Sequence, residues 1–199
     1  MLRTLADRPR PPDPRRSTDA HDAALIARIA RGELAAFEAF YREYHDRLGR
    51  FLGLMTSHAA LVEEALNDTM LVVWRRAATF NGQSKVSTWL FAIAYRTALK
   101  ALRSHDEPVE DPDADRFAAE GAGPEQRRSE SEVRAALARA LDGLSHEQRS
   151  VLVLTYFHDL PYAEIALIVG CPEDTVKTRA FHGRRRLRAL LAGEAEDWL

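Results

Sequence analysis

Apolar residues recur at helical spacing along most of this chain, and this periodicity constrains the fold more than any other feature. From Asp22 onward they are separated by three or four positions, which is typical of helices that bury one face. No segment alternates with period two for long enough to be a strand, so the sequence predicts an all-α fold. The first apolar positions of the pattern are Leu25, Ile26, Ile29, Leu34, Phe37, Phe40, Tyr41, Tyr44, Leu48 and Leu52.

Two stretches lack this pattern and divide the chain. Residues 1–20 hold four prolines and five arginines, a composition that cannot bury surface, so we expect a disordered tail. Residues 105–128 are rich in Asp and Glu and contain three prolines, which predicts a flexible acidic linker. The sequence therefore predicts two small helical domains, at 21–104 and 129–193, joined by this linker.

Turn residues predict where the helices end. Breaks are expected near Gly32, at 81–84, at Gly143, at 160–161 and at 170–172. Ahead of the helix that follows Gly143, Ser145 and Gln148 have the spacing of a capping box.

Composition limits the classes of function. The 199 residues carry 28 Lys and Arg against 30 Asp and Glu, so the formal net charge is -2 and any site for a polyanion must be local. Cys171 is the only cysteine, which excludes an internal disulfide and a multi-thiolate metal site and fits a reducing compartment. No apolar run approaches the roughly 20 residues of a membrane helix, so we expect a cytoplasmic protein with no direct membrane insertion.

The C-terminal stretch has the pattern of a helix-turn-helix. Gly170 suits the left-handed residue that ends one helix, and Pro172 suits the first turn of the next. Between Val176 and Leu191 the chain carries six Lys and Arg and no acid. A solvated basic face is the ordinary interpretation of such a run, but the turn and an outward Phe181 favour a helix in the major groove of DNA. The inward positions of this helix are Val176, Ala180, Gly183, Leu187 and Leu190.

On this hypothesis the outward residues have two roles. Those early in the helix reach base edges, and they are Lys177, Thr178, Phe181 and His182. The arginines hold phosphates, which gives affinity without reading sequence, and they are Arg179, Arg184, Arg185 and Arg188.

Two further patterns lie in the N-terminal helices. The helix expected at about 58–78 has one apolar face and, beside it, a second stripe that contains Met70 and Trp74. This stripe is either a surface for a partner or part of the core. In the helix that opens at Ser87, the aromatic residues Trp89, Phe91 and Tyr95 lie close to Lys85, Arg96, Lys100 and Arg103. Such a mixture can stack unpaired bases along a phosphate backbone, or its aromatic residues can be the buried side of an amphipathic helix. The sequence leaves both alternatives open.

Longer motifs resemble a known family. Val62-Glu-Glu-Ala-Leu-Asn-Asp-Thr-Met-Leu-Val-Val-Trp74, followed by Phe80-Asn-Gly and Val86-Ser-Thr-Trp-Leu-Phe-Ala-Ile-Ala94, resembles the second conserved domain of bacterial sigma factors. Leu144-Ser-His-Glu-Gln-Arg-Ser-Val-Leu-Val-Leu-Thr-Tyr-Phe157, with Pro161-Tyr-Ala-Glu-Ile-Ala166 and Thr175-Val-Lys-Thr-Arg179, resembles the fourth. Two such domains with no third between them are similar to the extracytoplasmic-function (ECF) group of the sigma-70 family.

The resemblance implies a protein that binds core RNA polymerase, directs it to particular promoters and helps to open the DNA. It implies that the clamp helices of the largest polymerase subunit are contacted by Glu64, Asn67, Met70, Leu71 and Trp74. The residues implied for the -10 element and melting are Asn81, Gln83, Ser84, Lys85, Ser87, Trp89, Tyr95 and Arg96. Those implied for the -35 element are the four base readers named above. The polymerase flap and an anti-sigma factor are the other implied partners, and the acidic linker matches a segment that threads toward the polymerase active-site cleft.

Some positions depart from the family pattern. Glu64-Ala-Leu-Asn67-Asp68 stands where the family usually shows Asp-x-x-Gln-Glu, which keeps the polarity of that surface. Arg96 and His182 stand where asparagine and arginine are common, and this affects the promoter sequence rather than the activity.

Other classes of protein compete with this interpretation. An enzyme is disfavoured because the chain has no phosphate-cradling glycine loop and no His-Glu-x-x-His, and we expect no cofactor, metal or small-molecule substrate. A self-sufficient helix-turn-helix regulator and a degenerate sigma-like protein that binds only a partner remain alternatives.

Overall fold

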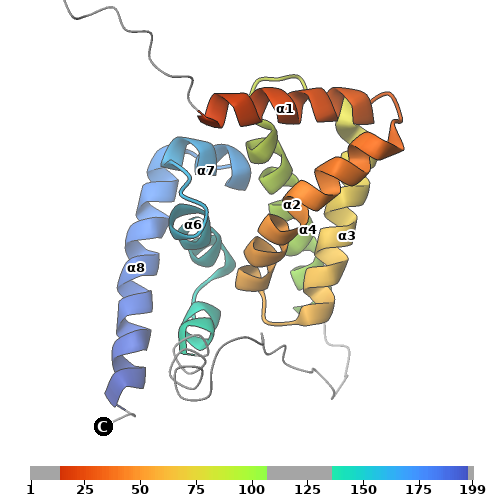
Figure 1. Ribbon diagram of the computed structural model, residues 1–199. Coiled ribbons are helices and arrows are strands. Elements are labelled where there is room, and N and C mark those ends of the chain that lie inside the picture. The colour runs from red at the N-terminus through yellow and green to blue at the C-terminus, as the bar shows by residue number, and fades with distance from the viewer. Residues whose placement is uncertain (1–13, 107–135, 197–199) are drawn as a thin grey trace, which may run out of the picture.

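The computed structural model describes residues 14–106 and 136–196, and every regular element within these ranges is a helix (Figure 1). The predicted all-α fold is confirmed. Most of the predicted acidic linker, and the first 13 residues of the predicted tail, lie outside the described residues. No helix in the described ranges is both long and apolar enough to cross a bilayer.

The N-terminal half consists of α1 (Pro14–Ile29), α2 (Leu34–Met55), α3 (Ala59–Arg76), a short 3-10 helix η1 (Ala77–Thr79) and α4 (Val86–Asp106). In Figure 1, α1 lies across one end of the bundle that α2, α3 and α4 form. The break between α1 and α2 lies at Gly32, as predicted, where the backbone is left-handed with φ of +80°. The predicted tail was wrong over residues 14–20, because α1 already begins at Pro14; proline is tolerated at the first helical position, where its missing N–H has no partner to lose.

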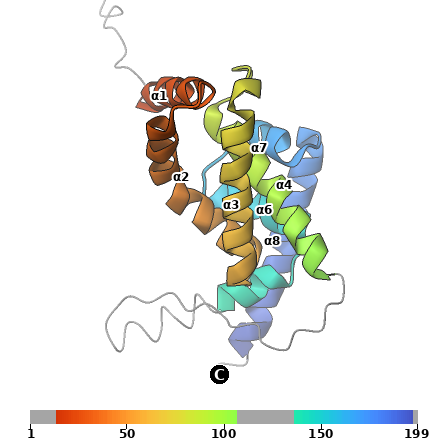
Figure 2. The same ribbon diagram turned by 90° about the vertical axis from the view of Figure 1, so that its right-hand side faces the viewer.

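The C-terminal half contains a helical segment at 136–142, then α6 (His146–Tyr156), α7 (Tyr162–Val169) and α8 (Glu173–Glu196). Ser145 caps α6, since its side chain accepts a hydrogen bond from the backbone N–H of Gln148 at 3.3 Å. In this half α7 packs against α4 and α6 packs against α2, and Figure 2 shows α6 and α8 behind α3 and α4 in that view.

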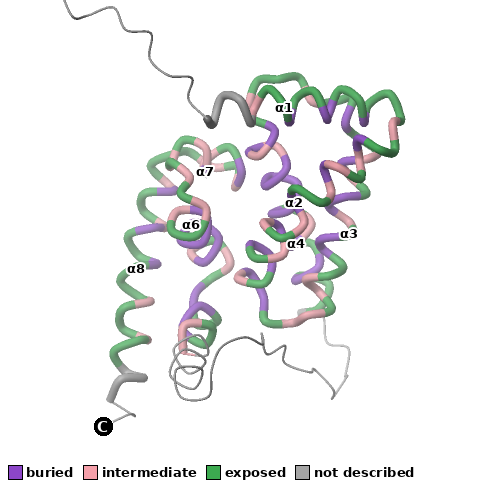
Figure 3. The backbone as a smooth tube through the Cα atoms, viewed as in Figure 1, coloured by how far each residue is buried: buried purple, intermediate pink, exposed green. Residues whose placement is uncertain are grey.

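The core of the N-terminal half lies between α2 and the helices around it. Phe40, Tyr44 and Phe51 are fully buried on one face of α2, and the buried stretches in Figure 3 turn inward on each helix. The Tyr44 hydroxyl donates a hydrogen bond to the Asp22 carboxylate at 2.5 Å, which ties α1 to α2. Burial raises the pKa of Asp22, and burial beside that carboxyl raises the pKa of Tyr44.

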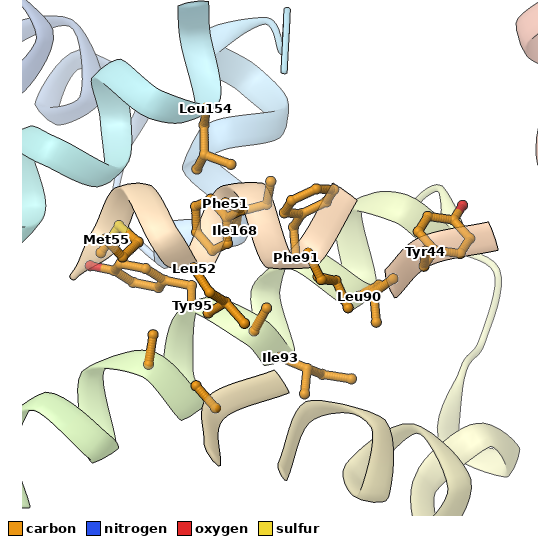
Figure 4. Close-up of a cluster of buried hydrophobic side chains, with 14 of the residues drawn as sticks. Tyr44, Phe51, Leu52, Met55, Leu90, Phe91, Ile93, Tyr95, Leu154 and Ile168 are labelled. Atoms are coloured by element: carbon orange, nitrogen blue, oxygen red, sulfur yellow. The ribbon is translucent and has the colours of Figure 1, made fainter. Parts of the chain in front are cut away.

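The two halves share one hydrophobic core. Figure 4 shows Leu154 of α6 and Ile168 of α7 close to Phe51 of α2 and Phe91 of α4. His158, in the α6–α7 loop, completes this contact with its ring 4.8 Å from that of Phe91. We call this packing of the two halves the closed arrangement, and it differs from the predicted picture of separate domains on a tether. The physical reason is that α6 and α7 carry apolar side chains that find their partners on α2 and α4.

Burial changes the chemistry of His158. Its ring lies 5.9 Å from that of Phe51, and its Nε2 is buried without a hydrogen-bond partner in the described part of the chain. Burial, together with the nearby charges of Arg47 and Arg50, lowers the pKa of His158 to about 4. The imidazole in the closed arrangement is therefore neutral at physiological pH.

Arg149 forms a second, polar contact between the two halves. This buried α6 side chain donates to the backbone carbonyl of Met55 in the N-terminal half at 2.7 Å, and to that of Leu141 at 2.8 Å. Its guanidinium also lies 3.0 Å from a carboxylate oxygen of Asp142. A buried arginine with these partners satisfies the carbonyl at the end of α2, which the helix itself leaves unpaired.

Candidate nucleic-acid interface

The turn between α7 and α8 has helix-turn-helix geometry. Gly170 ends α7 with φ of +69°, and the backbone N–H groups of Gly170 and Cys171 both donate to the carbonyl of Ala166, at 2.9 and 3.2 Å. Val176 and Ala180 are fully buried on the inner face of α8. The predicted inward stripe and the predicted breaks at Gly170 and Pro172 are thus confirmed.

Gly183 lets α8 approach α6 closely. A Cβ atom at this position would lie 3.2 Å from a methyl carbon of Leu152, which is tighter than ordinary van der Waals contact. The absence of a side chain at Gly183 therefore sets how closely α8 packs against α6.

The outer face of α8 is basic with one aromatic residue in it. Phe181 is 56% exposed, and its ring packs edge-on against that of His182 at 5.3 Å. Arg179 is half-buried, whereas the other predicted contact residues of this helix are exposed: Lys177, Thr178, Phe181, His182, Arg184, Arg185 and Arg188. An apolar ring between cations on one exposed helix face can contact both base edges and phosphates.

Some of these residues already have partners within the chain. Lys177 lies 3.2 Å from Glu173 and 3.1 Å from Asp174, and hydrogen bonds to these carboxylates raise its pKa. The Thr178 hydroxyl donates to the carbonyl of Asp174 at 2.9 Å. Arg184 donates to the Tyr162 hydroxyl at 3.0 Å, which joins α8 to the start of α7.

The α3 surface only partly matches the predicted polymerase contact. Glu64 and Asn67 are exposed, and Leu71 is 43% exposed, which is unusual for a large apolar side chain. Trp74 is half-buried, with its ring 5.3 Å from that of Phe37. Met70 is only 3% exposed, so its side chain lies in the core of this structure and not on the α3 surface; it faces inward because α3 packs against both α2 and α4.

The loop before α4 is open to solvent. Asn81, Gln83 and Lys85 are exposed, and Ser84 and Ser87 are half-buried. The Asn81 side chain accepts a hydrogen bond from the backbone N–H of Gln83 at 3.1 Å, which shapes the turn.

The aromatic residues of α4 separate into two groups. Trp89 is half-buried against Phe80, with a ring separation of 5.5 Å, and Arg96 is exposed. Tyr95 is only 5% exposed, so its ring is not available for base stacking in the closed arrangement, and Phe91 is fully buried. The amphipathic alternative therefore holds for these two residues, because the C-terminal half covers this side of α4.

A basic cleft lies where α4 meets the C-terminal half. It has a volume of about 630 Å³ and its cations are Arg96, Lys100 and Arg103 from α4 and Arg179 from α8. Glu147 is the acid in its wall, and hydrogen bonds at the start of α6 lower the pKa of that carboxyl. Within 14–106 and 136–196, no three His, Cys, Asp or Glu side chains gather into a group that could hold a metal ion.

One contact at this interface could not be predicted from sequence patterns. Glu164, in the first turn of α7, accepts hydrogen bonds from Lys85 Nζ at 2.5 Å and from Thr88 Oγ1 at 3.1 Å. An acid in a first helical turn is ordinary because it complements the helix dipole, so nothing local marks Glu164 as a contact between the halves.

Comparisons with known proteins agree with this geometry. Residues 40–107 match the family Sigma-70 region 2, and residues 134–187 match Sigma-70, region 4. The chain is 34% identical over 176 residues to the ECF RNA polymerase sigma factor SigM of Mycobacterium tuberculosis, covering 85% of this chain and 84% of SigM.

Solved structures share the fold. The RpoE sigma factor from Bartonella quintana, in complex with the anti-sigma factor NepR, matches with a TM-score of 0.60 and 25% identity, covering 78% of this chain and 98% of that one. CnrH, in complex with the cytosolic domain of CnrY, has a TM-score of 0.66 and 23% identity, with 87% of this chain and 98% of that chain covered.

Proposed function

Because this chain belongs to the ECF group of the sigma-70 family of RNA polymerase sigma factors, we propose that its exposed surfaces bind core polymerase and two promoter elements. The observation that carries the proposal is the pairing, in one chain and in this order, of a region 2 helical bundle with a region 4 helix-turn-helix whose basic face points outward. Neither unit alone would distinguish promoter selection from simple DNA binding.

The proposed polymerase surface is the outer face of α3. Glu64, Asn67 and Leu71 are accessible there, with Trp74 at its edge. An exposed leucine between polar residues suits a helix-on-helix contact, in which the leucine is buried on binding while the polar residues set the register. The partner proposed for this face is the pair of clamp helices of the largest polymerase subunit, and the C-terminal half is proposed to contact the flap.

The proposed promoter surfaces lie on α8 and in the loop before α4. Phe181 and His182 are free to contact bases of the -35 element, while Lys177 and Thr178 would first exchange partners within their own helix. Residues 81–85 and the start of α4, including Ser87, Trp89 and Arg96, are proposed to take the -10 strand, and a base extruded there would regain stacking energy against aromatic residues.

An anti-sigma factor is a further proposed partner. Support comes from the RpoE relative, which was solved in complex with NepR. We place the protein in the cytoplasm, where core polymerase works, and assign it no catalytic activity, because its contribution is binding and positioning.

Transcription with core polymerase from the source organism tests the proposal. Sequencing the transcripts started on genomic DNA should give a small set of start sites that depend on this protein. Leu71→Glu should remove both co-migration with core enzyme and start-site selection. Leu34→Glu is the matched control, because Leu34 is an exposed leucine at the start of α2 outside the proposed surfaces, and it should keep both.

The alternatives give different results in the same experiment. A self-sufficient regulator would bind duplex promoter DNA equally well without polymerase. A degenerate sigma-like protein would bind a partner and select no start sites.

A further inference from the structure

Glu164 is the single carboxylate of α7 that reaches the proposed -10 surface. Its two oxygens accept from an ammonium group, Lys85 Nζ, and from a hydroxyl, Thr88 Oγ1. The Glu164 side chain is only 18% exposed, so this ion pair is better shielded from solvent than an ordinary surface pair.

The same donors suit a nucleic-acid phosphate. A phosphate presents anionic oxygens to Lys ammonium and Ser or Thr hydroxyl groups, which is how proteins commonly hold a DNA backbone. The carboxylate of Glu164 presents two anionic oxygens to both donors at once, and it therefore occupies the positions that a phosphate would take.

The surrounding contacts hold this carboxylate in place. Ile165 and Ile168, on the same short helix, are fully buried in the shared core, so α7 cannot withdraw Glu164 without disturbing the packing against α4. On α4, Thr88 is buried, so its hydroxyl is held in place, whereas the exposed Lys85 lies just ahead of the helix and its ammonium group is held by Glu164 itself.

We propose that Glu164 is an intramolecular competitor of the -10 strand, and that the closed chain blocks its own single-strand site at Lys85 and Thr88. This inference rests on the proposed function, since it assigns a regulation to the same loop. Docking of α7 and binding of a DNA strand at these donors exclude each other, and by linkage each weakens the other by the same factor.

Two measurements on the full chain test the competition. Carbodiimide treatment should join the Lys85 amine to the Glu164 carboxyl as an amide, because the two groups are in contact in the closed arrangement, and peptide mass spectrometry detects the product. A saturating amount of a fluorescein-labelled single-stranded DNA of mixed sequence should suppress this cross-link.

The second measurement is the affinity for that oligonucleotide by fluorescence anisotropy at low salt. Glu164→Gln keeps the shape and removes the charge, so it should bind roughly fivefold more tightly than the wild type, the lower end of ordinary coupling between sites. Glu38→Gln is the matched control, since it removes one exposed charge from α2 away from the loop; it should bind as the wild type does.

The outcomes separate this inference from the proposed function. If no Lys85–Glu164 cross-link forms, or if Glu164→Gln binds no more tightly than Glu38→Gln, the competition is wrong while promoter selection can still be seen in the transcription experiment. If the cross-link forms but neither the wild type nor Glu164→Gln binds the oligonucleotide, the loop is not a strand-binding site and the inference falls with it.

Discussion

The buried His158 makes the stability of the closed arrangement depend on pH in a way that can be calculated. Its pKa is lowered from 6.5 to about 4 by burial between the two halves and by Arg47 and Arg50, while Asp159 acts in the opposite sense. In the unfolded chain the imidazole takes up a proton near its ordinary pKa, whereas in the folded chain it stays neutral until the pH approaches 4. The unfolded chain therefore binds more protons between these values, and stability falls as the pH falls.

The size of the effect follows from the two pKa values. Between about pH 7.5 and about pH 5, the difference in proton binding at this one residue lowers the free energy of unfolding by about 2 kcal/mol. For a chain of this length, 2 kcal/mol corresponds to a decrease in Tm of roughly 4 to 8 °C.

The assay compares the wild type with His158→Phe by urea unfolding at the two pH values. Phenylalanine keeps an aromatic ring against Phe51 and Phe91, and it loses no hydrogen bond, because the buried Nε2 has no partner among the described residues. Any constant packing cost of the larger ring cancels when each protein is compared with itself at the two pH values. The contributions of the other titrating groups cancel when the loss of the variant is compared with the loss of the wild type.

We expect the wild type to lose about 2 kcal/mol more than His158→Phe on acidification. His182→Phe changes an exposed histidine of α8 outside this interface and should keep the wild-type loss. Equal losses in the wild type and His158→Phe would refute the reasoning, because they would show that His158 is already solvated in the folded chain.

Three further predictions concern the turn at Gly170, the Arg149 contact between the halves and the proposed DNA-binding helix α8. Gly170→Ala should lower the free energy of unfolding by about 1 kcal/mol, because alanine is strained at a left-handed φ. Gly53→Ala, within α2, is the control and should raise the free energy of unfolding by about 0.5 kcal/mol. Urea titration measures both changes. Arg149→Ala should lower the free energy of unfolding by about 3 kcal/mol in the same assay, because the carbonyls of Leu141 and Met55 lose their donor. A decrease below about 1 kcal/mol would show that Arg149 does not stabilise the contact between the halves. In promoter-binding measurements with core polymerase, Phe181→Ala should weaken discrimination between -35 sequences, and Arg185→Ala should instead reduce the dependence of log affinity on log salt by about one unit.

Local chemistry in the sequence was enough to locate most of the helix ends and the exposed basic face of α8. Gly32 and Gly170 both lie at left-handed positions that end helices, and the buried positions of α8 follow from their spacing alone. Such features depend on a few neighbouring residues, and the sequence displays them directly. The start of α1 was missed because a run of prolines and arginines masks a single proline that is compatible with a first helical turn.

Contacts between distant helices could not be read in the same way. Periodicity shows that Met70 and Tyr95 lie on apolar faces, but it does not show what covers those faces. Tyr95 is buried because the C-terminal half packs on α4, and Met70 because α3 contacts two helices at once. Glu164 and Arg149 have ordinary local surroundings, and their contacts are with residues 79 and 94 positions away in the chain.

The core shared by the two halves has a consequence for the lifetime of the protein in a cell. Separation of the halves exposes Phe51, Leu154 and Ile168 to solvent. Large apolar side chains that are exposed in this way promote aggregation and proteolysis. A chain whose halves have separated is therefore degraded unless a partner soon covers the exposed apolar surface. The cellular concentration of the protein should then follow the supply of the partner that binds the opened chain.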